Sequence, residues 1–592
     1  GLGGAVFVRQ GGQLTIVGGG VGTALANTST AGLGADGGAD GEASGGGLYL
    51  MDQVDLAAEV AAGETLTLAS AIGGDGGITK TGAGELLLES AGNDYGGGTT
   101  VQEGRVVGSG DAIQGRFVLS ASDATLELEE ADMATGEVTA FISGAGKVEK
   151  DGLGTTILNP TGGTNNWLGG TEVLAGTLQA SAGALPPTDA VTVQAGATLV
   201  LNEPGAADDA TWAGGLVGDG AFLKTGPGTS RLTGSNSFTG TFTVEEGTLR
   251  GNVGSLPSAT PIRIEDARLV FDQGSAGTFS GTLQSVAMGQ GVLEKAGGGT
   301  LTFDTPHTTF TGDTVVSAGT LLLTESLGTV GSGAQASVNG GTLIVNGNGA
   351  LFADTTVALG ARLEGNASGA GDGLIGDLVL NGTLAPGSTV GTLRVDGNVT
   401  FGAASVYELE YDLTGPTADL LEVTGSAAID GELAIRLLGA GRGGPVAIVT
   451  AAGGRTGCFD SIVNQPGFFT FSLDCDPGPG DPNAVILDIA FDDTARFSDF
   501  ALTGNQTAVA NALDPPPDPD DAPFTDPWDE ARFELVKIPG RLPAVYDELG
   551  GEAHTAFTTA RLANAQEVGR VISARLRQVG VAAWAARAPW TS

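Results

Sequence analysis

The 592-residue chain has two histidines, His307 and His554, so a serine–histidine–aspartate triad would have to use one of them. His554 follows the segment Leu549-Gly-Gly-Glu-Ala and is interpreted as structural. His307 lies in a threonine-rich segment (Pro306-His-Thr-Thr-Phe310), and we expect it to be a surface histidine. The sequence contains no Gly-x-Ser-x-Gly motif to hold a nucleophile. No catalytic residue is therefore predicted.

Acidic residues are the other groups whose spacing could do chemistry. Glu408 and Glu410 would share one face of a strand, and paired carboxylates can hydrolyse glycosides. With 68 acidic residues such pairs arise by chance, so a solvated face is the simpler interpretation. Asp36, Asp40 and Glu42 match neither an EF-hand nor a nonapeptide calcium repeat. We therefore predict no enzyme activity, no metal site and no cofactor.

The two cysteines, Cys458 and Cys475, lie seventeen positions apart. An even pair at short separation favours a local disulfide in an oxidising compartment, which stabilises a fold by roughly 3 kcal/mol. The alternative is a pair of unrelated buried thiols. The spacing fits neither a zinc site nor a redox motif.

The formal net charge is −42, which argues against nucleic acid or anionic lipid as the main partner. A hydrophobic content of 41% is sufficient for a buried core. The 103 glycines separate short apolar stretches, as tight turns require, because glycine accepts a positive φ. No apolar run approaches the ~20 residues needed to span a bilayer as a helix. Because the chain opens with Gly1-Leu-Gly-Gly, we expect any targeting signal to have been removed.

A motif recurs four times: a lysine, glycines two and four residues later, and an apolar residue at position eight. Its lysines lie 70, 74 and 71 residues apart. The copies are Lys80/Gly82/Gly84, Lys150/Gly152/Gly154, Lys224/Gly226/Gly228 and Lys295/Gly297/Gly299. Each copy leads to a Val-x-x-Gly ending, as in Val101 to Gly104. Self-similarity at a fixed period indicates a solenoid or another repeat array.

An aromatic residue follows each copy of the motif, at Tyr95, Trp167, Phe238 and Phe310. We expect these rings to stack inside the coils and the motif lysines to be solvated at turns. The alternative is that lysines and rings together form a ladder on which carbohydrate stacks.

The pattern between the motifs is strand-like, with apolar residues at every second position, as in Leu199/Leu201 and Leu343/Val345. Helical periodicity is absent there, which excludes βαβ folds. A period of 70 to 74 residues corresponds to about three coils of ~24 residues each. The fold class is therefore predicted to be all-β, a right-handed parallel β-helix.

The pattern of hydrophobic and polar residues changes beyond residue 400. Longer hydrophobic strands over 401–500 indicate a cap on the last coil, because a solenoid must cover its end. A Pro- and Asp-rich stretch over 501–531 predicts an extended, solvated linker. The apolar stripe of residues 552–579 predicts a single α-helix, with Arg561, Arg570, Arg575 and Arg577. Residues 532–592 carry 8 basic and 5 acidic residues, a net charge of +3, whereas the first 531 carry −45.

These features resemble an autotransporter passenger, the secreted part of the type V secretion family. Lys80-Thr-Gly-Ala-Gly84 and its three copies resemble the passenger-associated strand repeat, and Leu384-Ala-Pro-Gly-Ser-Thr-Val-Gly391 resembles the segment before a pertactin-like C-terminal region. The resemblance implies that residues 401–500 are that pertactin-like cap, which acts as an autochaperone-like folding nucleus. It also implies that residues 532–580 lead into a translocator barrel whose polar lumen takes the four arginines.

Seven segments follow from the pattern and the resemblance together. They are N-terminal coils with a Gly-rich loop (1–72), the four repeats (73–325), further coils (326–400), the cap (401–500), the linker (501–531), the helical segment (532–580) and the possible start of a first barrel strand (581–592). The twelve-stranded barrel that the family carries is missing from this sequence, which stops at Ser592.

Two functional hypotheses remain. The first is a structural or adhesive rod on the Gram-negative cell surface, or released from it after crossing the periplasm, that mediates attachment or self-association. Its partners would be the outer-membrane barrel in cis and host or abiotic surfaces, glycans or other copies. The second is the β-helical stalk of a secreted enzyme whose catalytic domain lies upstream of residue 1.

Overall fold

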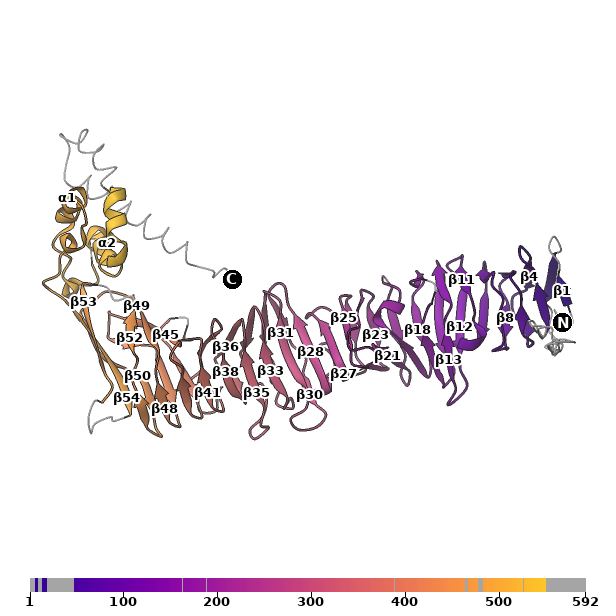
Figure 1. Cartoon of the computed structure of the whole chain (residues 1–592), viewed down its shortest axis with the longest axis horizontal. Coiled ribbons are helices and arrows are strands. Elements are labelled where there is room, and N and C mark those ends of the chain that lie inside the picture. The colour runs from indigo at the N-terminus through magenta and orange to yellow at the C-terminus, as the bar shows by residue number, and fades with distance from the viewer. Residues whose placement is uncertain are drawn as a thin grey trace, which may run out of the picture. The chain divides into compact units, whose positions relative to one another are not determined.

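The computed structural model describes residues 6–8, 13–18 and 47–549, except 162, 188, 388, 464–466, 477–482 and 525. The chain divides into two compact units. The first comprises residues 1–319 and 331–334, and the second comprises 320–330 and 335–592. Within each unit, short strands of successive coils lie side by side (Figure 1). The predicted β-helix is confirmed, because the coils pair through parallel strands.

One coil of the first unit shows how the sequence produces this arrangement. Strands β11 (Arg116–Leu119), β12 (Thr125–Glu129) and β13 (Thr135–Val138) follow one another and belong to three different sheets. Each pairs in parallel with the equivalent strand of the next coil, β14 (Phe141–Gly144), β15 (Lys147–Asp151) or β16 (Thr155–Leu158). A coil therefore has three faces, and every second residue of a strand points inward.

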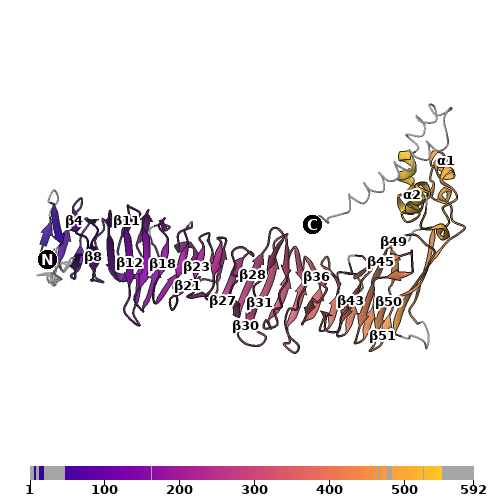
Figure 2. The same cartoon turned by 180° about the vertical axis from the view of Figure 1, so that it is seen from behind.

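The N-terminal coils of the first unit build sheets along these faces. One sheet contains β1 (Val6–Val8), β3 (Leu48–Leu50) and β6 (Ile72–Gly73). Another contains β2 (Leu14–Gly18), β4 (Asp55–Val60), β7 (Gly77–Thr81), β9 (Thr99–Val101), β11, β14 and β17 (Asn166–Trp167). A third contains β5 (Thr65–Leu68), β8 (Glu85–Leu88), β10 (Arg105–Gly108), β12, β15, β18 (Thr171–Val173), β20 (Val191–Val193), β23 (Leu216–Gly218) and β26 (Asn236–Phe238). Figure 2 shows β12, β18 and β23 along this last column.

The other strands of the first unit continue the faces. They are β13, β16, β19 (Thr177–Ala180), β21 (Thr198–Asn202), β22 (Asp209–Trp212), β24 (Ala221–Thr225), β25 (Thr229–Leu232), β27 (Thr241–Gly251), β28 (Ile262–Asp272), β29 (Gly277–Phe279), β30 (Leu283–Ser285), β31 (Val292–Ala296), β32 (Thr300–Phe303) and β33 (Asp313–Val316). The eleven-residue strands β27 and β28 each turn a corner of the coil and serve two faces.

The second unit repeats the three-faced plan. One face contains β34 (Thr320–Leu323), β36 (Thr342–Asn346), β39 (Arg362–Asn366), β42 (Thr383–Pro386), β45 (Val406–Asp412) with β46 (Thr417–Ala418), β49 (Glu432–Leu438) and β52 (Ser461–Val463). Another contains β35 (Gln335–Val338), β38 (Asp354–Val357), β41 (Leu378–Leu380), β44 (Val399–Phe401), β48 (Ala427–Ile429) and β51 (Arg455–Gly457). The third contains β37 (Ala350–Leu351), β40 (Gly373–Leu374), β43 (Thr392–Val395), β47 (Leu420–Val423), β50 (Gly443–Ala451), β54 (Ala484–Phe491) and β53 (Phe469–Asp474).

The last coils of the second unit differ from the others in ways that suit the end of a solenoid. Strand β54 pairs antiparallel with both β50 and β53, so it stops the parallel stacking. The predicted disulfide between Cys458 and Cys475 is present in this region. Asp419 is buried, and its two carboxylate oxygens accept the backbone N–H groups of Gly391 and Glu410, each at 2.8 Å. Burial raises the pKa of Asp419 to about 7.

Helices follow the last strand, where an extended linker was predicted over 501–531. They are η3 (Phe497–Phe500), α1 (Gly504–Leu513), η4 (Pro519–Asp521), α2 (Pro527–Val536), η5 (Pro539–Arg541) and residues 542–549. The prediction of an extended linker is wrong here, because α1 has a complete capping box. The Thr503 hydroxyl accepts the Gln506 N–H, and the Gln506 side chain accepts the Thr503 N–H. Asp526 caps α2, with Pro527 at the first helical position.

Buried polar contacts join these helices to one another. The Gln506 side chain also donates to the Pro543 carbonyl at 3.2 Å and to Asp547 at 2.9 Å. The Tyr546 hydroxyl donates to the Phe497 carbonyl at 2.7 Å. The helix predicted over 552–579, its four arginines, His554, the strand predicted within 581–592 and the acids at 36, 40 and 42 lie outside the described residues. Among the residues that are described, no helix has the length and hydropathy to cross a membrane.

Candidate functional site

The four motif lysines are fully buried, with no exposed side-chain surface. Each Nζ donates to three backbone carbonyls: those of the next residue, of the first motif glycine and of a residue one coil further on. For Lys224 these are Thr225 at 2.7 Å, Gly226 at 2.8 Å and Glu246 at 3.2 Å. The prediction that these lysines are solvated at turns is wrong. We call this arrangement the lysine clasp.

The other three clasps have the same partners at equivalent positions. Lys80 donates to Thr81 (3.0 Å), Gly82 (2.5 Å) and Glu103 (3.2 Å); Lys150 to Asp151 (2.5 Å), Gly152 (2.8 Å) and Ala175 (3.3 Å); Lys295 to Ala296 (2.7 Å), Gly297 (2.8 Å) and Ala318 (3.0 Å). An ammonium group has three donors, so each clasp uses all of them. Desolvation lowers the pKa of all four lysines, and that of Lys295 to about 8.

The first glycine of each motif is required by the clasp. Gly226 adopts a left-handed φ of +72°, and so do its counterparts Gly82, Gly152 and Gly297, at +70° to +73°. This backbone conformation turns the carbonyl of the glycine toward the lysine, and L side chains rarely adopt it. The positive φ expected of turn glycines is therefore confirmed at this position of the motif.

The second glycine of each motif is required for a different reason. The second glycines are Gly84, Gly154, Gly228 and Gly299. None of them has a left-handed φ, so the expectation of a positive φ is wrong at this position. They lie against the backbone of the preceding coil instead: a Cβ at Gly154 would be 2.2 Å from the Ala131 oxygen, and a Cβ at Gly299 would be 2.4 Å from the Ser275 oxygen. Close approach of two coils, and not the turn, excludes a side chain here.

The glycine of the Val-x-x-Gly ending completes the corner. Gly247 lies directly against the motif of the preceding coil. A Cβ at Gly247 would be 2.4 Å from the Gly226 oxygen and 2.5 Å from the Gly228 oxygen. Side chains are therefore excluded where the two corners meet, which explains both halves of the repeated motif.

Successive clasps lie on successive faces of the β-helix. Lys150 stacks in register on Leu128, Gly108 and Leu88, and Leu88 is the apolar residue at position eight of the first motif. Lys224 stacks in the same way on Leu201, Ala180 and Leu158. Lys295 stacks on Phe271 and Gly251. From one clasp to the next, the chain therefore makes three full coils and then continues to the next face. The predicted repeat length was three coils.

Each repeat thus moves the motif by one face of the coil. Because a coil has three faces, three repeats bring the motif back to its starting face. Lys80 and Lys295 consequently occupy the same face of the coil, in coils that lie far apart. The clasps are distributed around the first unit and do not form one column.

The motif aromatics lie inside the coils, as predicted. Tyr95, Trp167, Phe238 and Phe310 are all at most 1% exposed. The polar atoms of the first two are satisfied internally: the Tyr95 hydroxyl lies 2.8 Å from Thr99 Oγ1, and Trp167 Nε1 donates to the Gly170 carbonyl at 3.1 Å. Since rings and lysines are both buried, the alternative of an external carbohydrate-stacking ladder is wrong.

Buried acids form a second recurring feature that the sequence analysis missed. Glu130 and Glu203 lie one coil below the motif glycines and accept N–H groups from two short helices, η1 (Gly110–Ala112) and η2 (Ala182–Ala184). Glu130 Oε1 accepts from Gly110 at 2.5 Å, and Glu203 Oε1 accepts from Ala182 at 2.8 Å and from the Ser230 hydroxyl at 3.1 Å. Burial raises the pKa of both carboxyls. Their spacing of 20 and 21 residues before Lys150 and Lys224 was the available signal.

Buried asparagines bridge neighbouring coils two residues before the aromatic position. Asn93 Oδ1 accepts the Ile72 N–H at 3.0 Å, and its Nδ2 donates to the Ala112 carbonyl at 3.0 Å. Asn165 makes the equivalent bonds to Ile142 and Ala184, at 2.9 and 2.8 Å. Each side chain thus satisfies a donor and an acceptor of two different coils.

His307 takes the asparagine's place in the fourth repeat. The prediction of a surface histidine is wrong, since only 1% of the residue is exposed. Its Nδ1 accepts the Leu283 N–H at 3.2 Å, and its ring packs edge-on against Phe303 with centroids 4.3 Å apart. Desolvation lowers its pKa to about 4, and Asp304 opposes this shift weakly. Because Nδ1 is used as an acceptor, the ring is neutral and structural.

The acid pair considered for glycoside hydrolysis forms ion pairs instead. Glu408 pairs with Arg362 at 2.7 Å, and Glu410 pairs with Arg436. Within the described part of the chain, no group of three or more His, Cys, Asp or Glu side chains could hold a metal ion. The acids therefore link coils on the surface.

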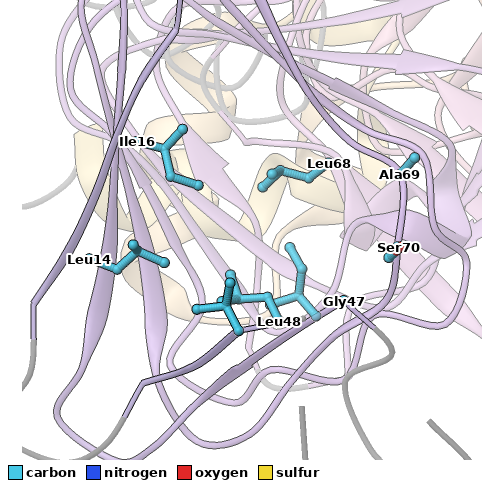
Figure 3. Close-up of a pocket in the computed structure, with 9 residues that line it drawn as sticks. Leu14, Ile16, Gly47, Leu48, Leu68, Ala69 and Ser70 are labelled. Carbon is cyan, nitrogen blue, oxygen red and sulfur yellow. The ribbon is translucent and has the colours of Figure 1, made fainter. Parts of the chain in front are cut away.

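A cavity of about 230 Å³ lies at the first coils (Figure 3). Its lining includes the aliphatic side chains of Leu14, Ile16, Leu48 and Leu68, with the Ser70 hydroxyl as the polar side chain. No two groups suited to acid–base or nucleophilic chemistry meet there. The recurring polar structure of the described coils is the clasp.

Comparison with known proteins agrees with this architecture. Residues 78–107, 148–180, 222–250 and 293–323 match the passenger-associated-transport-repeat family, and each match contains one clasp lysine. The chain is 28% identical over 293 residues to the adhesin BmaC autotransporter of Brucella suis biovar 1 (strain 1330), covering 49% of this chain and 7% of that protein. It is 27% identical over 256 residues to an extracellular serine protease of Serratia marcescens, covering 39% of this chain and 23% of that protein. The chain therefore spans less than a quarter of either relative.

The structure is a parallel β-helix, and its four clasp segments match the passenger-associated-transport-repeat family, which confirms the resemblance drawn from their lysines and glycines.

Replacing a clasp lysine is expected to loosen one coil. Lys224→Met keeps the aliphatic stem but leaves three carbonyls without their donor, which should cost about 3 kcal/mol of local stability. Hydrogen exchange followed by mass spectrometry should show faster exchange in peptides covering residues 222–250. The matched control is Lys147→Met. The Lys147 ammonium is partly exposed and pairs with Glu149 and Glu172, but Arg105 also pairs with the buried Glu149, so this change should cost under about 1 kcal/mol. Equal exchange in the two variants would contradict the clasp.

The buried histidine should make the fourth repeat sensitive to acid. A folded pKa of about 4 lies below the unfolded value of about 6.5, so His307 favours folding fully above pH 6.5 and loses about 3 kcal/mol as the pH falls to 4. His307→Asn restores the residue type of the earlier repeats and should remove this difference. Thermal unfolding of both proteins from pH 7 to pH 4 tests it. Identical pH dependence in the two would contradict this assignment.

Proposed function

We propose that this chain is the shaft of an adhesive autotransporter passenger, held outside a Gram-negative cell or released from it. The observation that carries the proposal is that the repeated side chains of the described coils serve the fold. Lysines, aromatics, asparagines and the histidine all point inward and satisfy backbone groups or fill the core. The outer surface is then free to vary, which suits a scaffold that presents contact surfaces.

The adhesin relative supports this role, since it is similar to almost half of the chain. The acidity of the surface supports it as well, because a net charge of −42 keeps an elongated β-protein soluble and discourages pairing of exposed strand edges. Ion pairs that join neighbouring coils, such as Arg231 with Asp209 and Arg268 with Glu294, add cohesion without consuming the core.

The predicted segments other than the extended linker enter this proposal with their original boundaries. Residues 401–500 would cap the shaft and start its folding. Residues beyond 532 would lead into an outer-membrane translocator in cis, with Arg561, Arg570, Arg575 and Arg577 in its polar lumen. The helices found between 497 and 549 would lie between cap and translocator.

The second candidate is the stalk of a secreted enzyme. The similarity to an extracellular serine protease over 39% of the chain favours it, since a β-helix can carry a catalytic domain at its N-terminal end. In that case the activity would reside in residues upstream of residue 1.

The adhesive role predicts that cells displaying the chain attach and settle. The chain would be fused to a translocator barrel on a non-adherent Gram-negative strain, and attachment and sedimentation would be compared with a barrel-only strain. The deletion variant should remove residues 80–294, because joining Thr79 to Lys295 places the fourth motif on the face of the first and keeps the coils in register. We expect attachment to fall at least tenfold in this variant at equal surface expression.

The comparison also separates the two candidates. If the full chain confers no attachment or settling above the barrel-only strain, the adhesive proposal fails and the stalk remains. If the deletion variant attaches as well as the full chain, adhesion does not reside in these coils.

A further inference from the structure

Each clasp joins two neighbouring coils of the first unit. The lysine Nζ lies in one coil, and its third acceptor is a carbonyl of the next coil, 22 to 25 residues further along the chain. For Lys224 this acceptor is Glu246, at 3.2 Å. The bond is closed off from water, because the lysine is fully buried and Gly247 packs against the Gly226 and Gly228 oxygens. Two coils therefore cannot separate at a clasp without breaking a buried, charge-assisted hydrogen bond.

A polar bridge follows each clasp lysine by 12 to 15 residues and fastens the same region. The bridges are Asn93, Asn165, Asn236 and His307. Asn236 Nδ2 donates to the Ser255 carbonyl one coil further on, at 3.3 Å. The other two asparagines reach the coil before and the coil after, and the histidine reaches the coil before. Clasp and bridge together fasten four segments, which we call the fastened blocks: residues 72–112, 142–184, 224–255 and 283–318.

The coils between the fastened blocks are held differently. Residues 113–141, 185–223 and 256–282 contain no lysine, so they have no clasp. Each of these segments is tied to the block before it by a buried side chain that accepts a backbone N–H: Glu130 from Gly110, Glu203 from Ala182 and Gln273 from Val253. Glu203 also accepts the Ser230 hydroxyl of the following block. Ion pairs cross these coils at the surface, where such pairs contribute little. The first unit therefore alternates between blocks fastened by a buried ammonium group and segments without one.

We propose that the clasps are stops that arrest the unravelling of the β-helix when the chain is pulled. Each coil of a solenoid contacts only its neighbours, so a coil at an end peels away by breaking one interface. Backbone ladder bonds break one after another during peeling. A clasp instead closes a corner with one ammonium group that holds both coils, in a dry interior where hydrogen bonds are stronger than in water. Because forced unfolding is governed by the rate of opening, peeling pauses at each clasp.

The spacing of the clasps sets the length released between two stops. Neighbouring clasp lysines are 70, 74 and 71 residues apart. At ~3.6 Å per extended residue, and after subtraction of the ~16 Å that the folded coils span, each interval releases about 24 nm. A single coil would release only about 8 nm. The length of the steps therefore distinguishes arrest at the clasps from peeling coil by coil.

Steps of this kind suit a shaft that carries load. A shaft with stops keeps its length below a threshold force and then lengthens by one interval at a time, so a contact at its end is relieved before it breaks. This biological meaning rests on the proposed adhesive role, but the stops themselves do not, because they depend only on contacts within the first unit.

The test pulls the purified full chain by its two ends in an optical trap and records its length as the force rises. The steps of the wild type should include three of about 24 nm, one for each interval between neighbouring clasps. Lys150→Met removes the second stop while the aliphatic part of the side chain stays. It should merge two of these steps into one of about 49 nm, because 144 residues separate Lys80 from Lys224.

The matched control is Lys147→Met, which makes the same change in the same strand, β15. Because the Lys147 ammonium lies at the surface in ion pairs and holds no corner, all three steps should keep the wild-type length. Circular dichroism of each variant shows whether the β-helix has formed. If Lys150→Met does not fold, Lys224→Met replaces it and should merge the second and third intervals, which together contain 145 residues.

The inference is overturned if the wild-type coils open in steps of about 8 nm or in one event without pauses. It is also overturned if Lys150→Met keeps both steps, or if Lys147→Met merges them as well. The outcome is separate from that of the cell assay. Steps in the trap without cell attachment would retain the stops and remove the adhesive role, whereas attachment without steps would retain the adhesive role and remove the stops.

Discussion

The structure depends on one constraint of tightly stacked coils: carbonyl groups that turn inward at a corner need a donor that water cannot supply. The first unit meets this need with a buried ammonium group that reaches three carbonyls on two coils. A neutral side chain with one or two donors would leave a carbonyl unpaired, which costs more than the hydrogen bond itself contributes. The cost of burying the charge appears in the lowered lysine pKa values.

The other recurring features follow from this corner. Glycines are required because the clasped carbonyls of one coil lie within 2.3–2.6 Å of where a Cβ of the next coil would be. The repeat length of 70 to 74 residues carries each clasp to the next face, so the reinforced corners are spread around the solenoid. Between corners, outward residues join neighbouring coils through surface ion pairs, such as that of Arg231 with Asp209.

Much of this could be read from the sequence. Period-two alternation predicted the inward residues, the even cysteine pair predicted the disulfide, and the lysine–glycine motif predicted the repeat. The motif lysines were predicted to be solvated because lysine is rarely buried. The period-two alternation would have placed them inside, because Lys80 and Ile78 share one face of their strand, as do Lys224 and Phe222.

Helix α1 could have been predicted from a different signal in the sequence, whereas the role of some glycines could not be predicted from a single sequence. The capping box at Thr503 and Gln506 would have predicted α1. A glycine held by close approach, such as Gly154 or Gly299, looks the same in a sequence as a glycine held by a positive φ, because only the position of the neighbouring coil separates the two.

Lysine reactivity tests the central claim most directly. Four of the six lysines in the chain form clasps, and the other two, Lys147 and Lys537, form ion pairs with carboxylates; of these two, Lys147 is the exposed one, with 36% of its side chain accessible against 9% for Lys537. The native chain would be treated briefly with an amine-acylating reagent at about pH 8, digested and quantified by mass spectrometry, with a urea-unfolded sample as reference. The account predicts that Lys147 is modified in the native chain, while Lys80, Lys150, Lys224 and Lys295 react only after unfolding. Modification of the four motif lysines in the native chain at the rate of Lys147 would contradict it.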